Sequence, residues 1–315
     1  MSLINKILTR DEIRTQPPVL LDIGASGSIH ENWKQIAPFS ICIAFDADDR
    51  EFGYITKESS GFKKLYVFNC IVTDQANSST DFFLTKSPFC SSVLEPDRKS
   101  LVPWAFAEKF DVDKKVNIKS ISLAKALQEI GIQRVDWFKS DSQGTDLRLF
   151  RNLSPQTQEN VIIAEFEPGI IDSYKGEDKF YELLSFMDKK NFWMCSATVK
   201  GSQRISQNSM EAFTSSPFMK KILQYSLKSS PGWVETVYFN TFSASLSIRE
   251  YLLGWVFATI QKQYGFALEI AEKGYSLYKD EIFNEMYKNS KKKIWSDILR
   301  LKFYPAIIEK ISKSL

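Results

Sequence analysis

The chain has 315 residues, of which 43% are hydrophobic and 25% are charged, a composition typical of a globular protein with a substantial core. Its 41 Lys and Arg against 38 Asp and Glu give a net charge of +3, which lacks the dense positive field of most nucleic-acid-binding proteins. Four cysteines without a CxxC pair provide neither a zinc motif nor a disulfide scaffold. The longest apolar run, YLLGWVFATI, is about half a membrane span. We therefore expect a cytoplasmic protein with no transmembrane segment and no nucleic-acid partner.

Short apolar runs alternate with helical patterns along the first 245 residues. Helical periodicity appears at 122–130, at 178–189 and in a short segment at 218–227. Between residues 70 and 105 the order is lost, and we expect an irregular insertion with a short hairpin around DFFLT. The runs that suit strands are VLLDI (19–23), ICIAF (41–45), LYVFN (65–69), VDWFKS (135–140), VIIAEF (161–166), FWMCSATV (192–199) and WVETVYF (233–239). This alternation predicts an α/β fold with a mostly parallel sheet and helices on both faces.

The last 70 residues show no strand signal. The segments REYLLGWVFATIQKQ, GFALEIAEKGYSLY and IWSDILRLKF predict successive amphipathic helices. We therefore divide the chain into a domain at 1–245 and a helical extension at 246–315. The extension carries 12 Lys and Arg against 8 Asp and Glu, and so holds the whole positive excess. Its run from Lys291 to Lys293 makes it a candidate for peripheral membrane contact or for assembly into a homo-oligomer, although such runs are more often solvated faces.

The first predicted strand runs directly into LDIGASGS, a turn with Asp22 at the strand end and glycines at 24 and 27. An acidic strand end, a glycine-containing turn and a following helix bring backbone amides close to a nucleotide-like ligand. The dinucleotide fingerprint GxGxxG fails here, because its second and third glycines are replaced by Ser26 and Ile29. This disfavours a nicotinamide-dependent reductase and suits a ligand without phosphates, such as S-adenosylmethionine.

The second predicted strand ends at FDADD, which places Asp46 at a strand end 24 residues after Asp22. A carboxylate there can accept hydrogen bonds from both hydroxyls of a ribose. The alternative interpretation is that the glycines form an ordinary tight turn and that Asp46 caps a helix. The two signals together favour a nucleoside-containing ligand.

The sequence resembles the FkbM-type S-adenosylmethionine-dependent methyltransferases. The resemblance covers roughly residues 17–205 and lies in LDIGASGSIHENW, IAFDADD, FNCIVTD, SSVLEPD, ISLAKALQEIGIQRVDWFKSDSQGTDLRLF and IIAEFEP, of which KSDSQGTD is the most specific. It implies a class I methyltransferase (Rossmann-like) fold whose seventh strand, near 236–239, is antiparallel. It also implies that the cofactor is bound by Asp22, Gly24, Ala25, Ser26, Gly27, Asp46, Ala47, Asn69, Cys70 and Asp141.

Methyl transfer to a hydroxyl requires alignment of the acceptor and removal of its proton. Asp141, Glu165 and Glu167 fall at or just beyond predicted strand ends, and we take Asp141 and Glu165 as catalytic candidates. His30, the only histidine, is a third candidate base, although a lone histidine is more often structural. The metal ligands are unknown, and a divalent cation held by a carboxylate pair is one option.

The acceptor comes from the resemblance alone, which points to O-methylation of a sugar on a surface glycan or on its nucleotide-sugar precursor in polysaccharide biosynthesis. Several aromatic side chains near the predicted ligand edge suit stacking on sugar rings, with core packing as the commoner alternative; they are Trp33, Trp104, Phe106, Trp137 and Tyr174. A different class of function also stays open, in which the protein is a non-catalytic scaffold whose C-terminal helices mediate assembly or membrane docking.

Overall fold

The computed structural model describes residues 2–24, 30–45, 61–75, 78–243, 246–300 and 312. The chain divides into two compact units. The first unit comprises residues 17–244, and the second combines residues 1–16 with residues 245–315. The sequence-based division at residue 245 assigned residues 1–16 to the first domain, whereas the structure groups them with the C-terminal helices.

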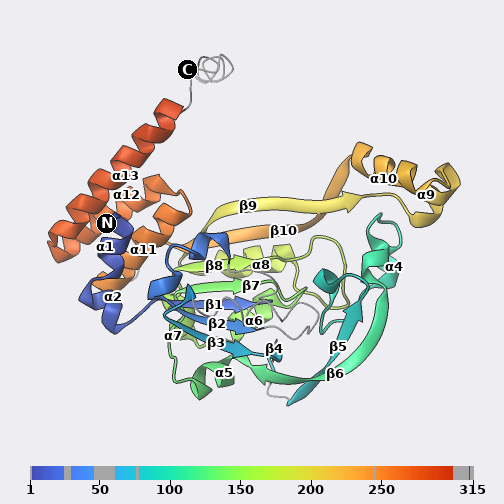
Figure 1. Ribbon diagram of the computed structural model, residues 1–315, viewed down its shortest axis with the longest axis horizontal. Coiled ribbons are helices and arrows are strands. Elements are labelled where there is room, and N and C mark those ends of the chain that lie inside the picture. The colour runs from blue at the N-terminus through green and yellow to red at the C-terminus, as the bar shows by residue number, and fades with distance from the viewer. Residues whose placement is uncertain are drawn as a thin grey trace. The chain divides into compact units, whose positions relative to one another are not determined.

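The first unit contains a sheet of seven strands in the described part of the chain (Figure 1). In spatial order these are β3 (Lys64–Phe68), β2 (Ile41–Phe45), β1 (Val19–Ile23), β7 (Trp137–Ser140), β8 (Ile163–Phe166), β10 (Ser229–Asn240) and β9 (Phe192–Gln203). β10 is antiparallel to both of its neighbours, while the pairs from β3 to β8 are parallel. The predicted mostly parallel α/β sheet with a reversed final strand is therefore confirmed.

Alternate residues of the central strands build the main core on one face of the sheet. Leu21, Phe138 and Ala164 pack there with apolar side chains of three helices: α5 (Leu123–Glu129), α6 (Asp146–Asn152) and α8 (Phe180–Met187). The short helix α7 (Pro155–Asn160) precedes β8. On the opposite face, Trp137 meets the edge of Trp33 from the 3₁₀ turn η1 (Glu31–Trp33), with ring centroids 5.8 Å apart. A second 3₁₀ turn, η2 (Ala37–Phe39), leads into β2.

The segment that we expected to be an irregular insertion with a short hairpin contributes two strands to a second sheet, whose third strand follows the segment. Its three strands are β4 (Ile71–Thr73), β5 (Ser79–Thr85) and β6 (Val112–Ser122), in the order β4-β6-β5. β5 pairs antiparallel with β6, which lies far along the chain, so the prediction of a short hairpin is wrong. β6 has the sequence VDKKVNIKSIS and is largely exposed, so it lacks the apolar run by which buried strands are recognised. Between these strands lie η4 (Pro88–Cys90), α4 (Arg98–Leu101) and η5 (Ala107–Phe110).

β9 and β10 are twelve residues long and pair along their whole length, from Phe192 opposite Asn240 to Gln203 opposite Ser229. β10 pairs with β8 only through residues 236–239. The remaining part therefore continues as a two-stranded ribbon, and two helices, α9 (Gln207–Phe213) and α10 (Pro217–Ser226), connect the strands at its end (Figure 1).

The second unit consists of helices α1 (Leu3–Leu8), α2 (Asp11–Thr15), α11 (Ile248–Ile260), α12 (Tyr264–Tyr278) and α13 (Glu281–Arg300). Ion pairs from Lys6 to Glu285 (2.7 Å) and from Arg10 to Asp280 (2.6 Å) join its N-terminal and C-terminal segments. α11 is buried from Arg249 to Thr259, around its whole circumference, and is therefore not the amphipathic helix that we expected. Among the described residues, no helix is both long and apolar enough to span a bilayer.

Candidate active site

Two cavities lie at the edge of the sheet where its parallel strands end, which is where open α/β sheets bind ligands. The larger has a volume of about 580 Å³, and its lining includes Asp141, beyond β7, and Glu167, beyond β8. The smaller, of about 100 Å³, is lined by Gly24, Cys70 and again Asp141, together with apolar side chains. Asp141 is thus common to both cavities.

A close backbone contact fixes the position of Asp141. Gly24 follows β1 with a φ of +77°, and a Cβ at this residue would lie 2.2 Å from the backbone oxygen of Asp141. The backbone N–H of Asp141 in turn donates to the backbone oxygen of Ile23 (2.9 Å). Glycine is therefore required at residue 24 both by the left-handed backbone and by the approach of the β7 turn.

Within the segment KSDSQGTD, Asp146 ties the end of β7 to the end of β8. Its carboxylate accepts hydrogen bonds from Ser140 Oγ (2.7 Å), from the backbone N–H of Ser142 (2.9 Å) and from the backbone N–H of Glu167 (2.7 Å). Because these donors come from both strand ends, Asp146 is a positioning residue for Asp141 and Glu167. Gln143 and Gly144, with φ of 55° and 101°, lie in the tight loop between Asp141 and Asp146.

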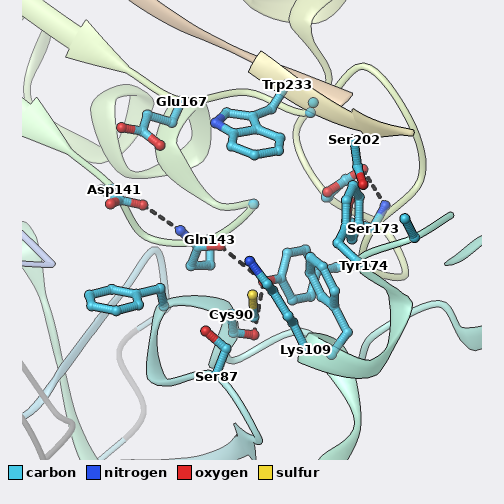
Figure 2. Close-up of a pocket in the computed structure, with 18 of the residues that line it drawn as sticks. Ser87, Cys90, Lys109, Asp141, Gln143, Glu167, Ser173, Tyr174, Ser202 and Trp233 are labelled. Carbon is cyan, nitrogen blue, oxygen red and sulfur yellow. Dashed lines mark hydrogen bonds between the residues drawn. The ribbon is translucent and has the colours of Figure 1, made fainter. Parts of the chain in front are cut away.

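A chain of polar contacts orients the carboxylate of Asp141 (Figure 2). Gln143 Nε2 donates to Asp141 Oδ1 at 2.5 Å. The Tyr174 hydroxyl lies 3.0 Å from Gln143 Oε1 and 2.9 Å from the backbone oxygen of Cys90. Because a carboxylate only accepts hydrogen bonds, the amide nitrogen of Gln143 faces Asp141 and its oxygen faces the Tyr174 hydroxyl. The Gln143 side chain thus leaves Asp141 Oδ2 as the oxygen available to a ligand.

Two of the four carboxyl groups among the described lining residues of the large cavity, Asp141 and Glu167, hold protons differently. Burial raises the pKa of Asp141 to about 6, partly offset by the nearby ammonium of Lys139. Burial also raises the pKa of Glu167, and repulsion from Asp141 and Asp146 raises it further, to about 9. Near neutral pH Glu167 therefore holds a proton more readily than Asp141 does.

A second group of charges lies on the sheet face opposite the main core, where Asp22, Lys139 and Glu165 are register neighbours on β1, β7 and β8. Lys139 Nζ donates to Asp22 Oδ1 (2.7 Å), and Trp137 Nε1 donates to Glu165 Oε1 (2.6 Å). Burial by itself lowers the pKa of Lys139, but the carboxylates of Asp22 and Asp141 raise it above its usual value. Burial raises the pKa of Glu165 to about 7. Glu165 is not among the described residues that line either cavity.

The other predicted site residues are distributed as follows. Cys70 is buried against the small cavity, and burial raises the pKa of its thiol. Asn69 is exposed. His30 is half-buried, with its ring centroid 6.0 Å from that of Trp33. Five predicted cofactor residues lie outside the described part of the chain: Ala25, Ser26, Gly27, Asp46 and Ala47. Within the described part, no group of three or more His, Cys, Asp or Glu side chains is arranged to hold a metal ion.

The aromatic candidates divide between the core and the large cavity. Trp33 and Trp137 are fully buried against each other, so they belong to the core. Phe106 and Tyr174 line the large cavity. Sequence reasoning missed Lys109 and Phe110, which lie in a segment without periodicity, and Trp233, whose place at the entrance of the last strand was a usable signal. Lys109 is the one basic residue among the described lining residues.

The strand order and the reversed strand β10 are consistent with a methyltransferase fold. Residues 48–194 match the family model described as the methyltransferase FkbM domain. This match confirms, over residues 48–194, the family resemblance seen in the sequence. No curated protein and no solved structure matches the chain.

Proposed function

We propose that this protein transfers a methyl group from S-adenosylmethionine to a hydroxyl group of a sugar, on a surface glycan or on its nucleotide-activated precursor. The observation that carries the proposal is the position of Asp141, which lines both the small cavity and the large one. A carboxylate shared by two adjoining cavities can face a bound donor and a bound acceptor at the same time.

The described residues around the small cavity, which has a volume of about 100 Å³, can hold part of the cofactor. Ile23, Phe45 and Val72 provide apolar walls, and the absence of a Cβ at Gly24 keeps the turn after β1 close to Asp141. Gly24, Cys70 and Asp141 are the predicted cofactor residues that line this cavity, while the predicted ribose ligand, Asp46, lies outside the described residues. S-adenosylmethionine supplies an electrophilic methyl group when it is bound.

The acceptor hydroxyl must lose its proton, and Asp141 Oδ2 is the base that we propose. A pKa of about 6 leaves this carboxylate ionised at neutral pH while keeping it basic enough to take a proton. Gln143 holds the other oxygen at 2.5 Å and so fixes the direction in which Asp141 accepts. The protonated carboxyl of Glu167 can donate a hydrogen bond to a neighbouring oxygen of the acceptor.

The large cavity suits a saccharide. Its volume of about 580 Å³ lies within the range of roughly 300–1,000 Å³ that is usual for small-molecule sites. Phe106, Tyr174 and Trp233 offer aromatic surfaces for sugar rings, and Gln203 and Ser202 offer polar groups for hydroxyls.

Titration calorimetry with S-adenosylmethionine and S-adenosylhomocysteine tests the donor. We expect micromolar binding of both ligands, weakened at least about tenfold in Asp46→Ala, because a ribose contact is lost. Asp172→Ala is the matched control, because the Asp172 side chain is 67% exposed and should leave binding unchanged. If the folded protein binds neither ligand at high micromolar concentration, the proposal fails.

The acceptor is then sought by incubating the protein with S-adenosylmethionine labelled in its methyl group and with panels of nucleotide sugars and purified glycans. Transfer of label to a sugar hydroxyl supports the proposal. Donor binding with transfer only to non-sugar acceptors would keep the methyltransferase activity and remove the sugar.

A further inference from the structure

Helix α10 is amphipathic, yet none of its residues is buried. Phe218, Ile222 and Tyr225 are spaced at i, i+4 and i+7, which places them on one face of the helix. Their exposed fractions are 70%, 41% and 81%. Such a face on a 10-residue helix is not explained by packing within the described part of the chain.

Hydrogen bonds and packing of the neighbouring helix α9 fix the position of α10. Ala105 N donates to the backbone oxygen of Gln203 (3.0 Å), and Gln207 Nε2 donates to the backbone oxygen of Ala105 (2.9 Å). Met210 of α9 is buried, and its sulfur lies 3.9 Å from Gln224 Nε2 of α10. The α9–α10 tip, defined here as residues 204–228, is therefore anchored by α9 and presents α10.

The charge of the tip shows which partner it fits. Its basic residues are Arg204, Lys220, Lys221 and Lys228, and Glu211 is its only acidic residue. Lys220 lies 3.4 Å from Glu211, whereas Lys221 is exposed on the border of the apolar face. A second copy of this positively charged surface would be repelled, while an anionic lipid surface satisfies both the aromatic side chains and the lysines.

We propose that the α9–α10 tip docks on an anionic membrane surface, with Phe218, Ile222 and Tyr225 entering the lipid headgroup region and Lys221 and Lys228 contacting anionic headgroups. Gln224, on the same helix, lines the large cavity, so docking holds that cavity at the lipid surface. If the proposed function holds, the acceptor is then a sugar carried by a lipid; the docking itself does not depend on that function.

Sedimentation with vesicles made of equal parts phosphatidylglycerol and phosphatidylcholine tests the proposal on the full chain. We expect the protein to sediment with these vesicles and not with pure phosphatidylcholine, and to be released by high salt. Phe218→Ala combined with Ile222→Ala should lower the partition coefficient at least about tenfold, because apolar area is lost from the interface. Lys221→Glu combined with Lys228→Glu should lower it at least about 20-fold.

Two control variants distinguish this surface from others. Tyr181→Ala removes an aromatic side chain of α8 that is 68% exposed and lies outside the tip, and it should leave vesicle binding unchanged. Replacing Lys291, Lys292 and Lys293 together by alanine tests the helical extension at 246–315. If that variant loses binding while both tip variants bind like wild type, the extension is the docking surface and the proposal is overturned.

Absence of wild-type binding to anionic vesicles also overturns the proposal. Light scattering then tests a second copy as the occupant: a dimer that Phe218→Ala with Ile222→Ala dissociates would assign the apolar face to self-association. None of these measurements requires methyl transfer, so failure of the docking proposal is distinguishable from failure of the proposed function.

Discussion

Buried carboxylates occur in two neighbouring regions of the sheet unit and behave differently. On the sheet face, Asp22 is bonded to the ammonium of Lys139, and Glu165 accepts from the Trp137 indole. In the large cavity, Asp141 accepts from a neutral amide, and burial together with carboxylate neighbours raises the pKa of Glu167. The first region, called here the sheet-face row, consists of Asp22, Lys139 and Glu165, and the Lys139 cation compensates its buried negative charge. The second region has carboxyl groups that face the cavity and can exchange protons.

The largest effect is expected in the cavity, for Asp141→Asn. The amide cannot accept the proton of an acceptor hydroxyl, so the rate of methyl transfer should fall by roughly 10²–10⁴. The change is nearly isosteric, and calorimetry should show that cofactor binding stays within a few-fold of wild type. Single-turnover transfer of labelled methyl to the acceptor found by the screen measures the rate.

Asp172→Asn is the control for this experiment, because the same change is made on an exposed aspartate. In wild type the rate should rise with pH through about 6 as Asp141 ionises, and this rise should be absent from the residual activity of Asp141→Asn. A wild-type rate in Asp141→Asn would remove this residue from the mechanism.

The largest effect on folding is expected in the sheet-face row, for Lys139→Met. Methionine fills much of the volume of the lysine but leaves Asp22 buried without its cation. Removal of one partner of a buried pair typically costs about 3–5 kcal/mol, and we expect a loss of this size in the free energy of unfolding at neutral pH. Urea denaturation measures it. The exposed pair of Lys6 and Glu285 offers the contrast, because Lys6→Met should cost less than about 1 kcal/mol.

The protonated carboxyl in the cavity gives a pH-dependent effect on stability. The folded pKa of Glu167, about 9, lies above its ordinary value, so the folded state binds the proton more tightly than the unfolded state does. The resulting stabilisation is complete at low pH and is lost as the pH rises toward 9. Glu167→Gln cannot lose this proton, so its stability relative to wild type should increase between pH 5 and pH 9 by up to about 1.4 kcal/mol per pH unit. A constant difference across that range, by urea denaturation, would show that Glu167 is ionised throughout.

The centre of the sheet was predictable because its strands β1, β2, β7 and β8 are buried on both faces. VLLDI and ICIAF coincide with β1 and β2, since a short continuous apolar run in an α/β protein is typical of a strand covered by helices on both sides. β6 could not be found in this way, because many of its side chains are charged or polar and lie in solvent. Its pairing with β5 is a long-range contact that local pattern does not encode.

The candidate site was predictable where a residue follows a strand. Asp141 and Glu167 were both expected at strand ends, and the structure places both in the large cavity. What sequence position could not supply is the direction of a side chain. Glu165 lies in β8 and Glu167 directly follows this strand. Glu167 lines the large cavity, whereas Glu165 contacts Trp137 on the sheet face. Gln143 and Tyr174 meet only because the chain folds back over 31 residues.

Glu165→Gln is expected to have the smallest effect and tests the comparison most directly. Glutamine keeps an oxygen that can accept from Trp137 Nε1, and Lys139 keeps its bond to Asp22, so the unfolding free energy should change by less than about 1 kcal/mol. The methyl-transfer rate should stay within about threefold of wild type, because Glu165 lines neither cavity among the described residues. Its pKa of about 7 alone would suit a general base. A loss of rate as large as that of Asp141→Asn would therefore mean that Glu165 is the base, although it lies outside the described lining of both cavities.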